Sequence, residues 1–267
     1  MTHNSFMTAP QPLARIEQIE RELSELVVLL PRFLERSDPR VIQWEDEIER
    51  SLQGKGNRAK AFEVRAFLAH MTGDIEFVER CMERAEINGA SELALAALRT
   101  TIYSNLGFST KAQEAGRRAF EVARLNLAIG VLWMTSAGAL NFAAKLLDQA
   151  ALAKIDCSHI THYDAILKVA SYTKMNVFSD AEFGKILDMA GELMREKKLF
   201  WLDLAPRISF DAEMNCAGIR YRLDVSPEEA SELNSQLTEK IVEADLVLVP
   251  LTVRFIGVQL EPTRVGF

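Results

Sequence analysis

The chain has 267 residues, 48% of them hydrophobic and 26% charged, so we predict a folded protein rather than a disordered one. This length is large for one compact core and suits an array whose core grows with each added unit. The net charge of −7 argues against nucleic acid as the main ligand, because phosphate binding needs a surplus of Lys and Arg on one face. A protein or peptide partner is therefore favoured.

The cysteines and the N-terminus indicate the compartment. Cys81, Cys157 and Cys216 are odd in number and widely spaced, which suits free thiols in a reducing environment. The N-terminus lacks a basic stretch followed by an apolar one, and no apolar run approaches the roughly 18 residues of a membrane span. We expect a cytoplasmic protein without membrane contact.

The chain begins with a predicted flexible N-terminus (1–10) and a helical hairpin (11–57) that caps the helical array. The first helix carries apolar residues at alternating spacings of three and four, which form a heptad seam. The seam residues are Ile16, Ile19, Leu23, Leu26, Leu30 and Phe33. We expect the seam to pack on a neighbouring helix of the same chain, with a homodimeric coiled coil as the alternative.

The second helix of this hairpin has clear start and stop signals. Asp38 followed by Pro39 is typical of a helix start, and Gly54 and Gly56 end the helix. Val41, Trp44, Ile48 and Leu52 lie on one face of it. This face is the predicted partner of the seam.

A recurring pattern organises residues 58–198. A glycine followed twelve residues later by an alanine occurs three times, and each copy is predicted to form a helix, a turn and a second helix. The pairs are Gly73 and Ala85, Gly107 and Ala119, and Gly138 and Ala150. These segments resemble tetratricopeptide (TPR) repeats, which have a glycine in the turn and small residues where the helices approach closely. A degenerate fourth copy falls on Ser171, Leu187 and Ala190.

The chain after the repeats is predicted to close the array. Residues 199–244 are assigned to a C-terminal helical pair, with one helix from Pro206 to about Tyr221 and another opened by Ser226 and Pro227. Residues 245–267 are rich in Val, Ile, Leu and Thr and are predicted to be an extended, β-like tail. The tail is expected to fold back on the last helices, or alternatively to pair with another chain. The fold class is therefore all-α: a right-handed TPR-like α-solenoid of antiparallel helix pairs with a short extended C-terminal tail.

The resemblance implies a binding groove on the concave face of the array. The residues at matching groove positions, which we predict to contact a partner, are Glu63, Phe67, His70, Thr101, Asn105, Leu132, Lys168, Tyr172 and Asn176. Only Lys168 among them is a lysine or arginine, so a clamp for a terminal carboxylate is disfavoured. The amide, aromatic and aliphatic side chains better suit an extended peptide or an amphipathic helix. We expect a non-catalytic adaptor or regulator without a cofactor.

Two alternatives remain open from the sequence. Arg65 and His70 resemble the R-x4-6-H motif of HEPN ribonucleases, in which the histidine acts in acid/base chemistry. A purely structural protein that assembles through its N-terminal helix or its tail is the other. Metal-ligand residue types also occur at Cys157, His159, His162 and Asp164, but this local cluster is more typical of a polar loop, so no metal site is predicted.

Overall fold

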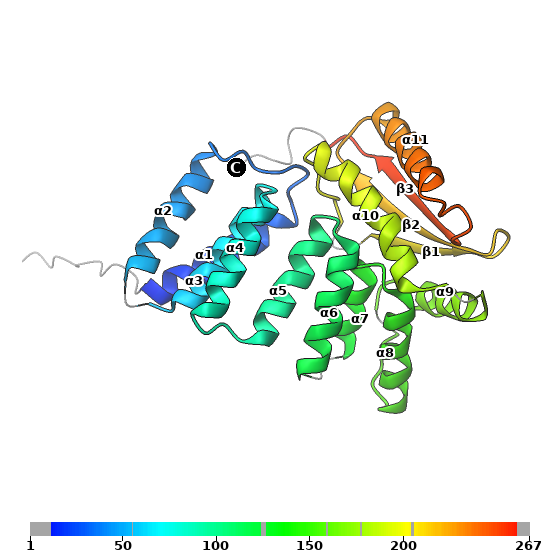
Figure 1. Cartoon of the computed structure of the whole chain (residues 1–267), viewed down its shortest axis with the longest axis horizontal. Coiled ribbons are helices and arrows are strands. Elements are labelled where there is room, and N and C mark those ends of the chain that lie inside the picture. The colour runs from blue at the N-terminus through cyan, green and yellow to red at the C-terminus, as the bar shows by residue number, and fades with distance from the viewer. Residues whose placement is uncertain are drawn as a thin grey trace, which may run out of the picture. The chain divides into compact units, whose positions relative to one another are not determined.

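A computed structural model of the chain describes residues 12–54, 56–123, 127–158, 160–176, 178–203 and 206–260, without the side chains of residues 12–14, 123 and 173–176. The described residues are mostly helical, with one three-stranded sheet (Figure 1). They form two compact units. One contains the described residues up to 27 together with 34–91, and the other contains residues 28–33 and the described residues from 92 onward.

The described part of the N-terminal unit contains four helices. They are α1 (Pro12–Val27), α2 (Pro39–Gln53), α3 (Arg58–Met71) and α4 (Ile75–Ile87). The seam residues of α1 from Ile16 to Leu26 are at most 7% exposed, and α1 packs against α2 and α3 of the same chain. The seam therefore contributes to the core of this unit, as the first of the two expectations stated.

Helix α1 ends earlier than the heptad spacing indicated. It stops at Val27, so Leu30 and Phe33 are not helical. The cause is Pro31, which disfavours helical backbone at the residue before it. Residues 28–33 belong instead to the C-terminal unit, where the Phe33 ring meets the Phe200 ring edge-on at 4.7 Å. The start of α2 is as predicted, because the Asp38 side chain accepts the N–H of Arg40 and proline occupies the first turn.

The C-terminal unit contains two further helical hairpins. They are built from α5 (Glu92–Asn105) and α6 (Ser109–Ala123), and from α7 (Leu127–Ser136) and α8 (Leu140–Leu152). Each of the three predicted turn glycines has a positive φ, from 67° to 74°, which an L side chain rarely adopts. The paired alanines Ala85, Ala119 and Ala150 are fully buried. The helix–turn–helix structure of all three copies is therefore confirmed.

The fourth copy differs from the other three. Its helices are α9 (Tyr163–Asn176) and α10 (Asp180–Glu196). In the described residues α9 packs mainly against α8, whereas α10 packs mainly against α6 and against the last helix, α11 (Pro227–Glu243). Gly191 of α10 approaches Gly107 so closely that a Cβ at position 191 would lie 1.9 Å from the Gly107 carbonyl oxygen. The resemblance to TPR repeats predicted that α9 and α10 pair antiparallel with each other. Helix α10 instead makes its main contacts with α6 and α11.

Helix α10 also satisfies the ends of the helices that it crosses. The Arg195 guanidinium donates to the carbonyl oxygens of Leu106 and Gly107, at 2.6 and 2.9 Å, where α5 ends. Asp188 accepts the backbone N–H of Thr110 at 3.1 Å, in the first turn of α6. Helix ends leave such backbone groups without partners inside the helix, so these contacts fix α10 in place.

The predicted helix from Pro206 to about Tyr221 is wrong, because a β-hairpin occupies this region. Strands β1 (Arg207–Asp211) and β2 (Cys216–Leu223) pair antiparallel. Buried residues alternate along β2 as Ala217, Ile219, Tyr221 and Leu223, and this period of two fits a half-buried strand. Pro206 indicated a helix start, but it precedes a strand, a position that proline also tolerates.

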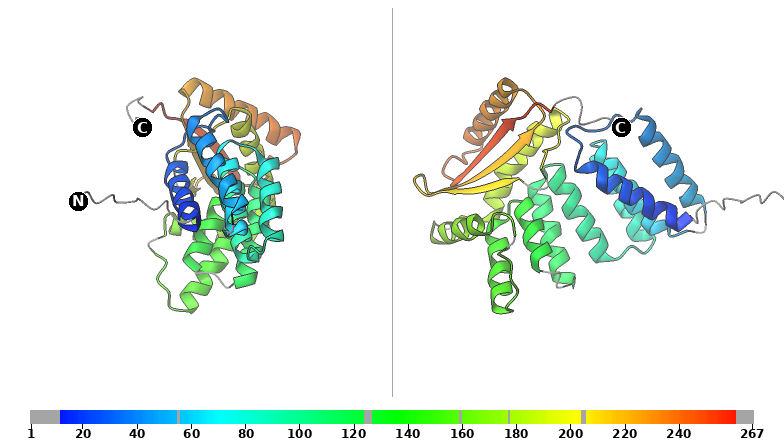
Figure 2. Two further views of the ribbon diagram at one scale, coloured as in Figure 1. Left: turned by 90° about the vertical axis from the view of Figure 1, so that its left-hand side faces the viewer. Right: turned by 180° about the vertical axis from the view of Figure 1, so that it is seen from behind.

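The predicted extended tail becomes the third strand. Strand β3 (Leu251–Gly257) pairs with β2 in parallel, and α11 forms the crossover between them. The tail thus folds back on its own chain. Helices α10 and α11 cover one face of the sheet, and Figure 2 (right) shows the sheet from its other side. The start of α11 is as predicted, with Ser226 and Glu229 forming a capping box.

Candidate functional site

The main candidate site is a cleft of about 820 Å³ in the C-terminal unit. It lies between α6, α8, α9 and the start of α10. Its apolar lining comes from Phe142, Ala144, Leu167, Ala170, Phe178 and Ala181. The polar lining comes from Arg117, Asn141, Lys145, Asp148, Ser171, Ser179 and Asp180. The combination of an apolar lining with a few polar groups is typical of ligand pockets.

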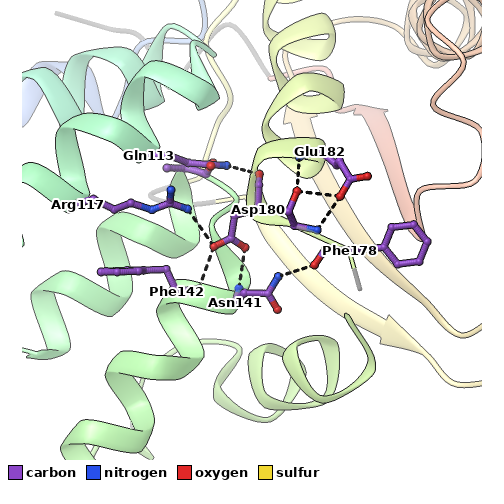
Figure 3. Close-up of polar contacts among 9 residues, drawn as sticks. Gln113, Arg117, Asn141, Phe142, Phe178, Asp180 and Glu182 are labelled. Atoms are coloured by element: carbon purple, nitrogen blue, oxygen red, sulfur yellow. Dashed lines mark hydrogen bonds and ion pairs between the residues drawn. The ribbon is translucent and has the colours of Figure 1, made fainter. Parts of the chain in front are cut away.

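Asp180 is the central polar residue of the cleft wall (Figure 3). Its carboxylate accepts the backbone N–H groups of Asn141 and Phe142, at 2.8 and 3.0 Å. These donors belong to the first turn of α8, whose own N-cap residue, Ala139, supplies no side-chain acceptor. Asp180 therefore caps α8 from a different helix, and it places a carboxylate at the positive end of the α8 dipole.

The sequence around Asp180 fixes it in this position. Ser179 caps α10: its hydroxyl accepts the N–H of Glu182, and the Glu182 carboxylate accepts the N–H of Ser179 at 2.7 Å. Asp180 is then the first helical residue and points inward, with only 6% of its surface exposed. Burial raises the pKa of Asp180, and the two backbone donors and Arg117 oppose this effect.

Gln113 joins α6 to the same wall. Its side-chain amide is buried and donates to the carbonyl oxygens of Ala137 and Asp180, at 3.1 and 3.0 Å (Figure 3). The Ala137 carbonyl directly follows the end of α7, where carbonyl groups lack intrahelical donors, whereas the Asp180 carbonyl belongs to the first turn of α10. The amide thus connects the α7–α8 turn to the start of α10 and makes this wall rigid.

The positive charges of the cleft come from Arg117 and Lys145. Arg117 lies over the Phe142 ring, 5.6 Å from its centroid, and donates to Asp180 at 3.3 Å. Lys145 and Asp148 are exposed on α8, and neither has an ion pair in the part of the chain that the structure describes. Lys145 thus remains available to an anionic group of a ligand whose apolar part contacts Phe142 and Leu167.

The predicted groove residues of the N-terminal unit are poor candidates for ligand contact. His70 is fully buried and its Nδ1 lies 3.2 Å from the carbonyl oxygen of Phe67, while Phe67 is only 9% exposed. Glu63 is half-buried and pairs with Lys60 at 3.5 Å. The side chains of Phe67 and His70 pack in the core of their own unit and do not present a surface to a ligand.

The predicted groove residues of the C-terminal unit differ in exposure. Thr101 and Asn105 are half-buried, whereas Leu132 and Lys168 are exposed. Tyr172 is half-buried, and its ring contacts Phe210 of β1 at 5.9 Å. Asn176 ends α9, but its side chain lies outside the described residues. None of these described side chains lines the cleft, although Leu167 and Ser171, which do, are the immediate neighbours of Lys168 and Tyr172.

The structure does not support the motif for ribonuclease chemistry. Arg65 donates to Glu45 and Glu49 of α2, at 3.0 and 3.1 Å. His70 is enclosed, and its burial lowers its pKa to about 4. A buried imidazole cannot reach an RNA substrate, so this pair offers no acid/base site.

The potential metal ligands are not assembled either. Cys157 is buried in a cluster of apolar residues from α7 and α8, and Asp164 is exposed. His159 lies outside the described residues. Within the described parts of the chain, no group of three or more His, Cys, Asp or Glu side chains is placed to hold a metal ion.

Comparison with protein-family models, with curated proteins and with solved structures finds no match to this chain. Among the described helices, none is both long and apolar enough to cross a membrane.

The sequence contained one signal for the wall of the cleft, which the assignment of residues 171–190 to a fourth repeat copy left unused. Ser179 and Glu182 have the spacing of a capping box, which predicts a helix start at residue 180. The resemblance to TPR repeats instead placed this region in the fourth copy, on Ser171, Leu187 and Ala190, without use of the capping box. The contacts of Asp180 with α6 and α8 join residues 38 to 67 positions apart, and no local pattern predicts them.

Proposed function

We propose that this protein is a non-catalytic protein-binding module, whose cleft between α8, α9 and α10 binds a peptide segment of a partner protein. The segment carries an acidic residue next to a bulky apolar residue. This proposal replaces the groove predicted from the TPR resemblance with the cleft, and it keeps the predicted class of partner.

The observation that carries the proposal is the composition of the cleft. Phe142, Leu167 and Phe178 offer an apolar surface for an aliphatic or aromatic side chain. Lys145 and Arg117 lie beside this surface and complement a carboxylate. The helical hairpins, with their glycine turns and buried alanines, also support an adaptor role, since TPR-like proteins commonly bind peptides.

A peptide-display selection against the intact protein tests this function. The expected result is a consensus with Asp or Glu beside Leu, Ile, Phe or Trp. Lys145→Glu reverses the available charge and is expected to weaken the selected peptides roughly tenfold or more. Leu167→Arg introduces a long charged side chain into the apolar lining and is expected to abolish binding.

The matched control is Lys185→Glu, the same charge change at an exposed position of α10 that does not line the cleft. This variant is expected to bind the selected peptides like the wild type. The proposal is wrong if no consensus emerges, or if the peptides bind the Lys145→Glu and Leu167→Arg variants with unchanged affinity while thermal unfolding shows that both are folded.

A further inference from the structure

A second feature lies on the face of the sheet opposite to α10 and α11, where three arginines form one row across the strands. Arg207 of β1 is paired with Arg220 of β2, and Arg220 is paired with Arg254 of β3. All three side chains are exposed, while their neighbours along each strand alternate to the buried face. Like charges directly opposite one another destabilise a sheet. Such a row therefore suggests a ligand of opposite charge.

The protein neutralises only part of this row. Asp203 pairs with Arg207 at 3.4 Å and with Arg222 at 2.9 Å. In the described part of the chain, Arg220 and Arg254 have no carboxylate partner, and Arg220 reaches only the Ser209 hydroxyl, at 3.5 Å. Two guanidinium groups on adjacent strands thus remain available to one anion.

The next row of the same face supplies neutral hydrogen-bond donors. It consists of Ser209, Gly218 and Thr252, which are paired across the three strands. A cavity of about 430 Å³ lies over these residues and is also lined by Arg220, Arg254 and Cys216. A Cβ at Gly218 would lie 2.6 Å from the Ser209 hydroxyl oxygen, so glycine keeps the centre of this surface open.

Two acidic residues of the hairpin, Asp211 and Glu213, also line this cavity. Asp211 accepts the backbone N–H groups of Glu213 and Met214, both at 3.0 Å, and so is engaged in the β1–β2 turn. The site therefore combines the two guanidinium groups of Arg220 and Arg254 with the two hydroxyl groups of Ser209 and Thr252.

We propose that this surface, formed by Arg220, Arg254, Ser209, Thr252 and Gly218, binds a phosphoryl group. A phosphoryl dianion presents three oxygens, which matches several converging donors, whereas a carboxylate is already satisfied by one arginine. A single-stranded nucleic acid would need aromatic side chains for base stacking, and the side chains of this row and the next are arginine, serine, glycine and threonine. This inference is independent of the function proposed for the cleft.

The test is a titration of the full chain with inorganic phosphate at constant ionic strength, followed by NMR of backbone amides. Saturable shifts are expected at Ser209, Gly218 and Thr252. The double variant Arg220→Ala/Arg254→Ala is expected to lose roughly tenfold or more in affinity. Arg84→Ala, at an exposed arginine of α4, is the control and is expected to leave the titration unchanged.

Two further arms identify the source of the phosphoryl group. A phosphoserine peptide that binds more tightly than inorganic phosphate, while its unphosphorylated form does not bind, assigns the site to a phosphorylated protein segment. Equal or stronger binding of inorganic phosphate or pyrophosphate assigns it to a small phosphorylated molecule. The proposal is overturned if the amide shifts fail to saturate with every probe, or if Arg220→Ala/Arg254→Ala and the milder Thr252→Val both bind phosphate like the wild type.

Discussion

The carboxylate of Asp180 accepts the backbone N–H of Asn141 at 2.8 Å, so the first residue of α10 caps the start of α8. This contact fixes the wall of the cleft, because the same carboxylate also accepts the N–H of Phe142, whose ring lines the cleft. The cap thus couples the stability of α8 to the shape of the candidate site.

Replacing Asp180 with alanine should therefore destabilise the start of α8. The change leaves two backbone N–H groups and the Arg117 guanidinium without their acceptor, and we expect a loss of about 2–4 kcal/mol in the free energy of unfolding. Urea unfolding measures the loss, and hydrogen exchange at the amides of Asn141 and Phe142 locates it.

Glu182→Ala is the matched control for this prediction. It removes the other carboxylate of the same helix start, which is on the exposed side and belongs only to the capping box. We expect a loss of about 1 kcal/mol and unchanged exchange in α8. Equal effects of the two variants would show that Asp180 does not cap α8.

The sequence predicted those elements whose signals are local. Asp38 with Pro39 and Ser226 with Pro227 marked the starts of α2 and α11, because capping depends on a few adjacent residues. The turn glycine at 107 was predicted because its positive φ needs a residue without a Cβ.

The sequence did not predict features that depend on contacts between distant segments. The hairpin of β1 and β2 was predicted as a helix, although the alternation of Ile219, Tyr221 and Leu223 fits a strand. Pairing with β3 stabilises this hairpin, and β3 lies beyond the whole of α11. The cleft was missed for the same reason, since its wall depends on contacts between α6, α8 and α10.

The burial of His70 predicts a specific dependence of stability on pH. Burial lowers the pKa of His70 from 6.5 to about 4. Between these values the unfolded chain binds a proton that the folded chain does not bind, so stability is lost as the pH falls from 6.5 to 4. One group with this shift accounts for about 3 kcal/mol across the window.

Comparison of the wild type with His70→Leu isolates this contribution. Leucine retains an apolar side chain of similar size but cannot be protonated, so the variant should lose less stability between pH 6.5 and pH 4. Chemical unfolding at several pH values measures the difference. Parallel stability curves for the two proteins over this range would contradict the prediction.

Asn234 protects the free edge of β3. Its side-chain amide accepts the backbone N–H of Phe255 at 2.8 Å and donates to the Phe255 carbonyl oxygen at 2.9 Å. An open strand edge is a template for pairing with another chain. Asn234→Ala should therefore cost about 1–2 kcal/mol and promote self-association through β3.

Light scattering over a range of concentrations checks the second effect. Asn234→Asp is the intermediate control, because a carboxylate still accepts the N–H of Phe255 but cannot donate to its carbonyl oxygen. A strictly monomeric Asn234→Ala variant with a fully protected Phe255 amide would show that α11 covers this edge without the amide.

The arginine row makes a prediction about stability that is opposite to the one about binding. Arg220 lies between Arg207 and Arg254, and like charges directly opposite one another destabilise a sheet, most strongly at low salt. Arg220→Thr removes both repulsions and introduces a residue that favours strands, so it should raise the unfolding temperature at low salt. Arg222→Thr on the same strand should not raise it, because Arg222 is paired with Asp203 at 2.9 Å.

If Arg220→Thr both raises the unfolding temperature and lowers the affinity for phosphate, the arginine row serves binding and not folding. If Arg220→Thr instead lowers the unfolding temperature at low salt, the row stabilises the sheet and the electrostatic argument for the site fails.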